Sequence, residues 1–539
     1  MNRREFLYRG AVGGVVLAVE PWVVTAAEAA GIRERFPGLA DAVLEKATGM
    51  GASFADFHVM QTESERVWAR EEMVQGVSAG SSLGCSVRVL VDGAWGFAAG
   101  TDVTEGTSLA LVDRAVALAK EQAGWMEAKV EIETLPAHVD RWEMSVAEDP
   151  FAVPVEDKAA HLLAINERAG AKGASFCQSS LTAVRERKWL ANSFGSRIEQ
   201  SRLRVHPRFS VTVVDGKKGG FASRASLAPP RAAGYEYVIS DGFTGDVDLA
   251  AEQAAEKLKA PSVKPGEKDL VIAPSNLWLT IHETVGHPTE LDRALGYEAN
   301  FAGTSFCTPD KLDDLQYASE IVTMRGDRTA EGGLSTIGYD DDGVRTAGRE
   351  FNIIDEGVFR NFQMALGQAQ RIRREESNGC AYADGYDSFP IQRMPNISLQ
   401  PGADDGVTAD DLIAGVEDGL YVVGNGSWSI DQQRYNFQFT GQVFHRIRNG
   451  KLDGMVKDAA YQGNSVSFWN ACDGLGGAGT YELGGAFNCG KGQPGQVAPV
   501  SHGAVPARFR RVNILNTVDE AGDEVAGNCD CSGGRDRWA

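Results

Sequence analysis

Residues 269–288 read DLVIAPSNLWLTIHETVGHP and carry the clearest structural and chemical pattern in the chain. The first five residues form a short apolar run that is typical of a buried strand. Pro274 and Ser275 are typical of a helix start, because proline is tolerated in the first turn and a serine oxygen can cap the free amides. The stretch therefore predicts a strand over 269–273 and a helix over 275–286 that ends in two histidines and a glutamate.

The spacing of His282 and His287 decides whether both can hold one metal ion. In zinc peptidases of the H-E-x-x-H type, the histidines are four positions apart, about 40° around the helix. Five positions correspond to about 140° on a regular helix. Gly286 is a poor helix former and Pro288 disfavours helical backbone at His287, so we expect the helix to loosen or end here, or to contain a one-residue π-bulge. The alternative is a pair of histidines at a helix end, satisfied by hydrogen bonds.

A catalytic zinc ion needs about three protein ligands and one open position. The further candidates are His445, His502, Glu290 and the cysteines. Cys489 stands out because the neighbouring glycines let the backbone approach a metal closely, although a lone cysteine is usually a buried packing residue. Cys529 and Cys531 lie in a polar, glycine-rich tail, where such a pair is either a redox or metal site or incidental.

The sequence predicts two parts of different character. Helices are expected at 36–46, 108–122, 155–171 and 249–259, and strands at 55–61, 66–69, 85–90, 95–99, 175–184, 188–191 and 204–214. Asp92-Gly93 is a hairpin-turn signal. Beyond residue 265 the chain is rich in glycine, with strands expected at 436–448 and 509–516 and a helix near 408–419. The fold class is α+β: an N-terminal α+β domain over 31–245, then a β-rich, twisted-sheet or barrel-like C-terminal domain over 246–539.

Composition excludes some classes of function. The chain has 539 residues, enough for several domains, and its net charge of −21 argues against a nucleic-acid partner. Residues 474–479 satisfy G-x-G-x-x-G, but no strand-turn-helix pattern surrounds them, so a dinucleotide site is not expected. An oxidoreductase would need a cofactor motif that the sequence does not offer.

Residues 1–30 have the features of an export signal. Arg3-Arg4 precede an apolar stretch at 10–19 and an alanine-rich segment at 26–30. The arginine pair is typical of a twin-arginine signal. The apolar stretch is shorter than the ~20 residues that span a bilayer, and no later segment is long and apolar enough. We therefore expect a protein in the periplasm or outside the cell, with no membrane span after signal removal.

At His282–His287, at 303–305 and at Asn488-Cys489-Gly490-Lys491-Gly492, the sequence resembles the TldD/PmbA family of metallopeptidases, once described as modulators of DNA gyrase. The resemblance implies a TldD-type subunit, because the TldE/PmbA-type subunits lack H-E-x-x-x-H. It also implies that His282, His287 and Cys489 are metal ligands, for Zn²⁺ or another divalent metal, and that Glu283 is the catalytic acid/base. It further implies small or unfolded peptides as substrates, and a homodimer or a heterodimer with a TldE/PmbA-like subunit.

These expectations combine into an exported metallopeptidase that hydrolyses peptide bonds through a metal-activated water. Glu283 would take the proton of the water and deliver it to the leaving amine. The alternative is a noncatalytic metal- or peptide-binding scaffold that pairs with a paralogous subunit. The two hypotheses differ in whether replacement of Glu283 has any effect.

Overall fold

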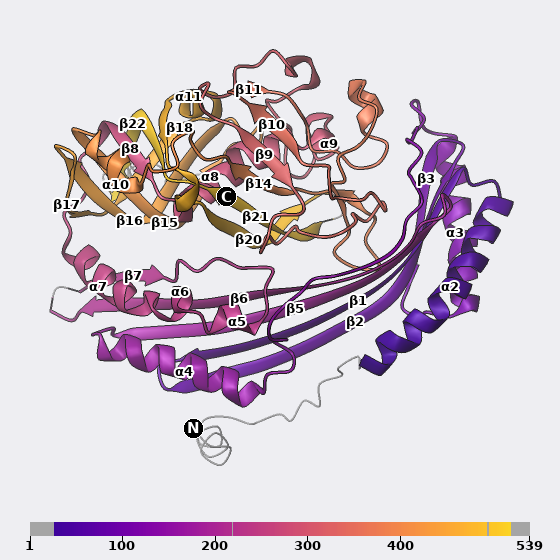
Figure 1. The fold of residues 1–539 in the computed structure, drawn as a ribbon, viewed down its shortest axis with the longest axis horizontal. Helices are drawn as coiled ribbons and strands as arrows, with labels where there is room; N and C mark the ends of the chain where they lie inside the picture. Colours follow the sequence, from indigo (N-terminus) through magenta and orange to yellow (C-terminus); the bar gives the residue numbers. More distant parts are fainter. Residues whose placement is uncertain (1–25, 218, 493–494, 519–539) are drawn as a thin grey trace, which may run out of the picture.

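The computed structural model describes residues 26–217, 219–492 and 495–518. The predicted export signal lies outside these residues except for its last five, which begin helix α2 (Ala26–Gly49), and Cys529 and Cys531 also lie outside them. Figure 1 shows two layers: a long curved sheet below, and a C-terminal part that lies over the concave side of the sheet.

The curved sheet has the strand order β3-β2-β1-β5-β6-β4, with β7 paired to β6. Its strands are β1 (Phe54–Arg70), β2 (Met73–Val91), β3 (Ala94–Gly100), β4 (Val139–Glu143), β5 (Phe176–Asn192), β6 (Arg197–Asp215) and β7 (Gly220–Ala225). The β2–β3 hairpin turns at Asp92-Gly93, where both residues have positive φ, as a two-residue type I′ turn requires. The predicted hairpin is therefore confirmed.

Helices α2, α3 (Glu105–Ala123) and α4 (Val155–Ala171) lie along the outer side of the sheet in Figure 1. Apolar residues of α2 and α3, among them Ile32, Val43 and Val112, pack against Phe57 and Val59 of β1 in one buried cluster. Helix α7 (Asp246–Lys259) packs against β6 and β7, after the short helices α5 (Tyr235–Val238) and α6 (Asp241–Thr244). The helix expected at 36–46 is thus part of a longer one, whereas that at 155–171 has the expected bounds.

The prediction of separate strands at 175–184 and 188–191 is wrong, because both belong to β5. Charged residues 185–187 lie between the two predicted segments. In the structure Glu186 is buried and forms ion pairs with Arg202 and Arg204 of the adjacent β6. Pairing across the strands removes the cost of burying these charges alone, so the strand continues.

The C-terminal part contains a closed five-stranded barrel. Its strands are β8 (Gly266–Ile272), β22 (Ala507–Asn516), β18 (Ala459–Asn464), β16 (Asn436–Arg448) and β15 (Asp418–Ile430). The ring closes because β15 pairs with β16 on one side and, in parallel, with β8 on the other. The α+β class with a barrel-like second part is confirmed. The helix expected near 408–419 is shorter, α10 (Ala409–Ala414), since strand β15 already begins at Asp418.

Smaller elements surround the barrel. They are α9 (Leu291–Ala294), β9 (Met324–Asp327), β10 (Phe351–Asp355), β11 (Val358–Phe359), β12 (Ala381–Tyr382), β13 (Ile391–Gln392), β14 (Asn396–Leu399), β17 (Lys451–Val456), α11 (Ser465–Asn470), β19 (Cys472–Leu475), β20 (Glu482–Lys491) and β21 (Gln496–Ala504). Strands β20 and β21 pair with each other in a separate hairpin.

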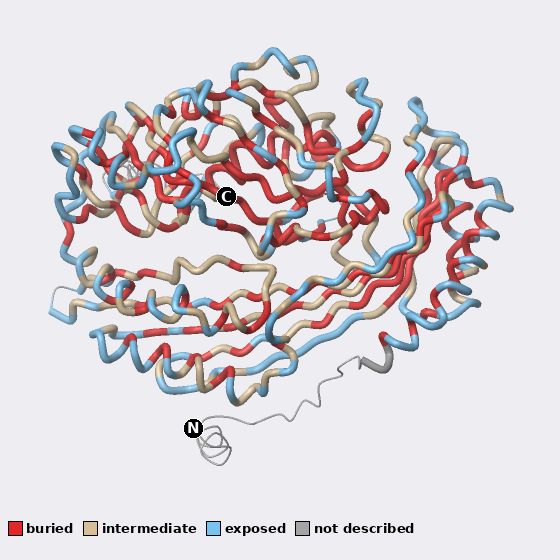
Figure 2. Tube along the Cα trace, viewed as in Figure 1, coloured by how far each residue is buried: buried red, intermediate tan, exposed pale blue. Residues whose placement is uncertain are grey.

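Helix α8 (Pro274–Ile281) lies between the barrel and the β20–β21 hairpin. Its residues Leu277 and Ile281 belong to the largest buried cluster, which Figure 2 shows as the red interior of the C-terminal part. Gly484 permits the close approach of β20, because a Cβ atom there would lie 2.3 Å from the ring of Trp278. Helix α8 therefore packs closely against β20 through Trp278.

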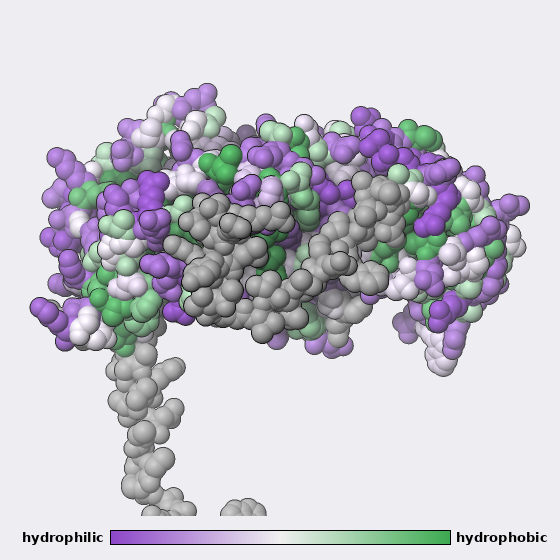
Figure 3. Space-filling view, turned by 90° about the horizontal axis from the view of Figure 1, so that it is seen from below, coloured by the Kyte–Doolittle hydropathy of each residue, from purple (hydrophilic) through white to green (hydrophobic). Residues whose placement is uncertain are grey.

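The surface seen from below mixes hydrophilic residues with smaller hydrophobic patches (Figure 3). Across the described parts of the chain, every helix is too short or too polar to cross a membrane.

Candidate metal centre

Helix α8 runs directly into a π-helical turn, η1 (His282–Gly286). The amide of His287 donates to the carbonyl of His282, five residues earlier, so both side chains leave the same face of the π-helical turn. Their ring centroids are 4.7 Å apart. Of the two alternatives that Gly286 and Pro288 allowed, the structure shows the π-bulge, and Pro288 lies in the 3₁₀ turn that follows, η2 (His287–Thr289).

Side chains from elsewhere hold the π-helical turn in place. The carbonyl of Thr284 accepts a hydrogen bond from the hydroxyl of Tyr317, and the carbonyl of Gly286 accepts one from Nε2 of Gln363 at 2.6 Å. Nε1 of Trp469 donates to Oγ1 of Thr284 at 2.9 Å. A buried π turn leaves some carbonyls without their regular helical partners, so the bonds from Tyr317 and Gln363 offset the cost of burying these carbonyls unpaired.

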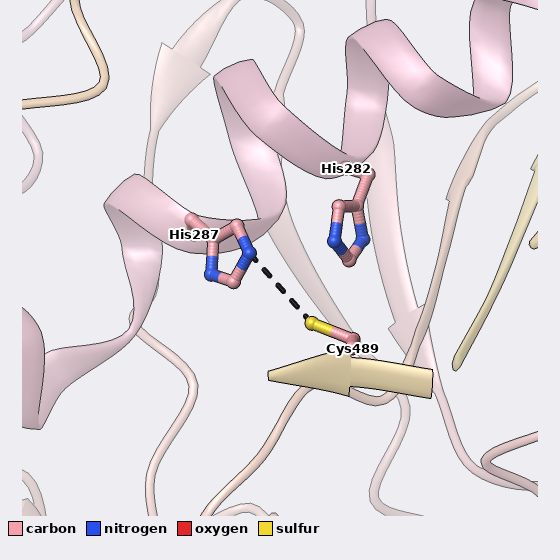
Figure 4. Close-up of side chains that lie close together, drawn as sticks. All are labelled: His282, His287 and Cys489. Carbon is pink, nitrogen blue, oxygen red and sulfur yellow. Dashed lines mark hydrogen bonds between the residues drawn. The ribbon is translucent and has the colours of Figure 1, made fainter. Parts of the chain in front are cut away.

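Cys489 of β20 lies beside His282 and His287, as Figure 4 shows. Its Sγ atom lies 3.7 Å from Nε2 of His287, and the potential ligand atoms of His282, His287 and Cys489 all lie within 4.8 Å of one another. All three residues are buried. Zinc–nitrogen and zinc–sulfur bonds of usual length in a tetrahedron separate the two ligand atoms by about 3.6 Å. The donor set and its spacing fit a zinc-type metal ion.

His287 is oriented by a carboxylate. Its Nδ1 atom donates to Oε2 of Glu290 at 3.0 Å, which leaves Nε2 facing Cys489. Glu290 is fully buried, and its negative charge is balanced by Lys491, whose Nζ lies 3.1 Å from Oε1 of Glu290. The same Nζ lies 2.7 Å from Oδ1 of Asp292. A histidine held by a carboxylate behind it is a recurrent feature of metal sites.

His502 of β21 lies beside His282. The Nε2 atom of His502 is 2.7 Å from Nδ1 of His282. Two of the remaining candidates, His502 and Glu290, thus lie behind the histidines rather than in the cluster. His445 is elsewhere, on β16, where its ring stacks on Tyr421.

The surroundings favour the protonation states that bind a metal. Burial lowers the pKa of both His282 and His287, so both rings are neutral at pH 7. Burial acts to raise the pKa of the Cys489 thiol, but the Arg393 guanidinium and His287 outweigh it and bring the pKa below its usual value. Neutral imidazoles and a thiolate are the forms that coordinate metals.

Glu283 is buried next to this cluster and forms an ion pair with Arg434, a residue that the sequence analysis did not identify. Nη1 of Arg434 lies 2.5 Å from Oε2 of Glu283. Arg434 occupies the turn between β15 and β16 with a φ of 64°, and its amide donates to the carbonyl of Asp431. In the sequence this turn is only a polar segment between two strands, so no local signal points to it.

Most of the chain matches one family. Residues 55–120 match the PmbA/TldA metallopeptidase domain 1, residues 148–260 match the central domain, and residues 265–510 match the C-terminal domain. The C-terminal match contains every residue of the cluster described above.

Individual relatives agree with this match. The chain is 27% identical to a metalloprotease of Methanothermobacter thermautotrophicus over 86% of its own length and 96% of the relative. It is 24% identical to a zinc metalloprotease TldD homolog of Saccharolobus solfataricus, over 87% and 98% of the two chains. The crystal structure of TldE from Thermococcus kodakarensis has a TM-score of 0.65 at 16% identity, over 88% of this chain and 99% of that chain, which shows a shared fold.

Proposed function

The chain belongs to the PmbA/TldA metallopeptidase family, and we propose that it is an exported, metal-dependent peptidase that hydrolyses peptide bonds in small or unfolded peptides. The observation that carries this proposal is the convergence of His282, His287 and Cys489 beside Glu283. Three ligands of this kind leave one position of a tetrahedral metal open, as in catalytic rather than structural sites.

His282, His287 and Cys489 would hold the metal. When bound, a divalent metal such as Zn²⁺ would polarise the scissile carbonyl and lower the pKa of a water molecule. The chain contributes the orientation of its ligands: Glu290 fixes the ring of His287, and Arg393 donates to the carbonyl of Cys489, which holds that part of β20. The burial of all three ligands keeps bulk water away from the site.

Glu283 would move the proton. Its carboxylate accepts a proton from the attacking water and returns it to the leaving amine, the role of a general base and then a general acid. Arg434 contacts Oε2, so we assign proton transfer to Oε1. The ion pair holds the carboxylate in one orientation beside the ligands.

The substrate would bind as an extended strand along β20. Within the described residues, β20 pairs only with β21, and Asn488 and Gly490 on either side of Cys489 are exposed. Strand addition relies on main-chain hydrogen bonds, which any extended peptide can form. Small or unfolded peptides are therefore suitable substrates, whereas folded proteins are not.

Export and assembly complete the proposal. The arginine pair of residues 3 and 4 supports twin-arginine transport, which would allow the metal to be loaded in the reducing cytoplasm before Cys489 meets an oxidising compartment. The likeness to TldE supports a partner that is a second copy or a TldE/PmbA-like subunit.

The export route is tested by replacing both arginines, Arg3 and Arg4, by lysine, which should stop accumulation of the protein in the periplasm, measured by cell fractionation. Unchanged accumulation would contradict this route.

The activity is tested with purified wild type and Glu283→Gln on an unfolded protein substrate. We expect the wild type to cleave, a chelator to stop cleavage, and added Zn²⁺ to restore it. Glu283→Gln should keep its metal and lose activity by about 10²- to 10⁴-fold, the usual contribution of an acid/base group. Metal bound by the wild type without cleavage of any unfolded substrate would contradict the proposal and favour the noncatalytic scaffold.

A further inference from the structure

Three buried groups form a line of hydrogen bonds that ends at the proposed metal ligand His282. The carbonyl oxygen of Ile397 lies 3.1 Å from Nδ1 of His502, and Nε2 of His502 lies 2.7 Å from Nδ1 of His282. Ile397 and His502 are fully buried, and His282 is 5% exposed. Each of the three groups is therefore in direct contact with the next.

The chemistry of the groups sets the direction of the line. A carbonyl oxygen can only accept, so Nδ1 of His502 carries a proton. A buried imidazole with a carbonyl on one side and an imidazole on the other has no anion to stabilise a positive charge, so His502 is neutral and its Nε2 accepts. The proton between the two rings therefore belongs to Nδ1 of His282, and Nε2 of His282 keeps its lone pair.

We propose that His502 is a positioning residue that fixes the tautomer and ring orientation of His282, so that the unprotonated Nε2 of His282 faces the metal. This inference rests on the proposed metal-dependent function. It goes beyond it because it assigns a role to a residue outside the ligand set, on a strand 220 positions away from His282 in the sequence.

The two histidine ligands thus have different supports. His287 donates to a charged carboxylate, Glu290, whereas His282 donates to a neutral ring. The backbone of β21 holds His502 firmly, since His502 pairs with Gly484 of β20, and the next amide, Gly503, donates to Oγ of Ser398 at 3.1 Å. The position of the accepting atom is therefore set by the fold.

The experiment measures Co²⁺ affinity and the cobalt absorption spectrum in the full chain and three variants. His502→Leu removes the acceptor at similar volume. His502→Gln places an amide oxygen where Nε2 was, with an amide nitrogen that can donate toward Ile397. His445→Leu removes a histidine outside the site and is the matched control. Circular dichroism and the Tm of each metal-free protein monitor folding.

We expect His502→Leu to bind Co²⁺ about 10- to 100-fold more weakly, the usual effect of losing a group that orients a ligand. His502→Gln should recover most of that affinity with a wild-type spectrum, and His445→Leu should match the wild type. Equal affinity in wild type and His502→Leu, or failure of His502→Gln to improve on a folded His502→Leu, would overturn the inference alone. A wild type that binds no divalent metal would overturn the proposed function and this inference with it.

Discussion

At the scale of single residues, the ion pair between Glu283 and Arg434 leads to the first prediction. Arg434→Gln removes the charge that holds Oε2 of Glu283. Because a small displacement of an acid/base group is costly, we expect a loss of about 100-fold in kcat with metal content unchanged. The measurement is steady-state cleavage of an unfolded substrate beside elemental analysis.

A surface arginine provides the control for this prediction. Arg446 lies on the same strand-turn-strand unit, and its ion pair with Asp453 is partly exposed. Arg446→Gln should keep wild-type kcat. A metal-loaded Arg434→Gln protein with full activity would show that the ion pair has no part in the reaction.

How well the residues of the candidate site can be predicted from the sequence depends on how close together they lie in the chain. His282, Glu283 and His287 fall within six positions, so their proximity was readable directly. Cys489 lies 202 positions from His287 and was singled out by a resemblance and by its flanking glycines. Arg434 had neither kind of signal, because its contact with Glu283 exists only once the β15–β16 turn is folded against η1.

At the scale of secondary-structure elements, the π-helical turn gives the second prediction. Tyr317→Phe leaves the buried carbonyl of Thr284 without its hydroxyl partner. We expect the free energy of unfolding to fall by about 1–3 kcal/mol, the cost of an unsatisfied buried polar group, and metal affinity to fall as the turn relaxes toward a regular helix. Denaturant unfolding and metal titration measure the two effects.

Tyr339→Phe is the matched control, because the hydroxyl of Tyr339 donates at 2.7 Å to Asp140 on β4 of the curved sheet rather than to the π-helical turn. It should leave metal affinity unchanged. If Tyr317→Phe unfolds like the wild type and binds metal equally well, the hydroxyl does not support the turn.

The sequence predicted the helix over 275–286 and left the form of its end open. Gly286 and Pro288 are compatible with both a broken helix and a π-bulge. The groups that stabilise the π form, Tyr317, Gln363 and Trp469, lie 33 to 185 positions away from their partners in the turn. Local propensity therefore indicated that the helix changes there, and tertiary hydrogen bonds decided how.

At the scale of the whole molecule, buried ion pairs join the curved sheet to the C-terminal part. Lys188 of β5 lies 2.5 Å from Asp341, and Arg88 of β2 lies 2.7 Å from Asp342. All four residues are buried. These contacts hold the layer that carries the proposed metal site over the concave side of the sheet (Figure 1).

Breaking one of these pairs gives the third prediction. Lys188→Met leaves the Asp341 carboxylate buried without its cation, and we expect a loss of about 3–5 kcal/mol in the free energy of unfolding. The double variant Lys188→Met, Asp341→Asn should recover part of that loss, because the uncompensated charge is gone. Lys268→Met breaks an ion pair with the exposed Asp418 and should cost less than about 1 kcal/mol. Equal losses in the two lysine variants would contradict this account of the interface.

The α+β class and a barrel-like second part could be predicted from the pattern of strands and helices. The extent of the four long strands β1, β2, β5 and β6 could not, since charged residues such as Glu186 are buried inside them by cross-strand pairing. Barrel closure could not be predicted either, because β8 and β15 pair in parallel although about half of the C-terminal part lies between them in the sequence.

Metal content of the purified protein is the most direct test of the metal centre. The wild type is compared with Cys489→Ser and with Cys472→Ser, which replaces another buried cysteine outside the cluster. We predict close to one divalent metal ion per chain in the wild type and in Cys472→Ser, and a large loss in Cys489→Ser. A folded Cys489→Ser protein that keeps its metal at the wild-type level would contradict the assignment of this cluster as the metal site.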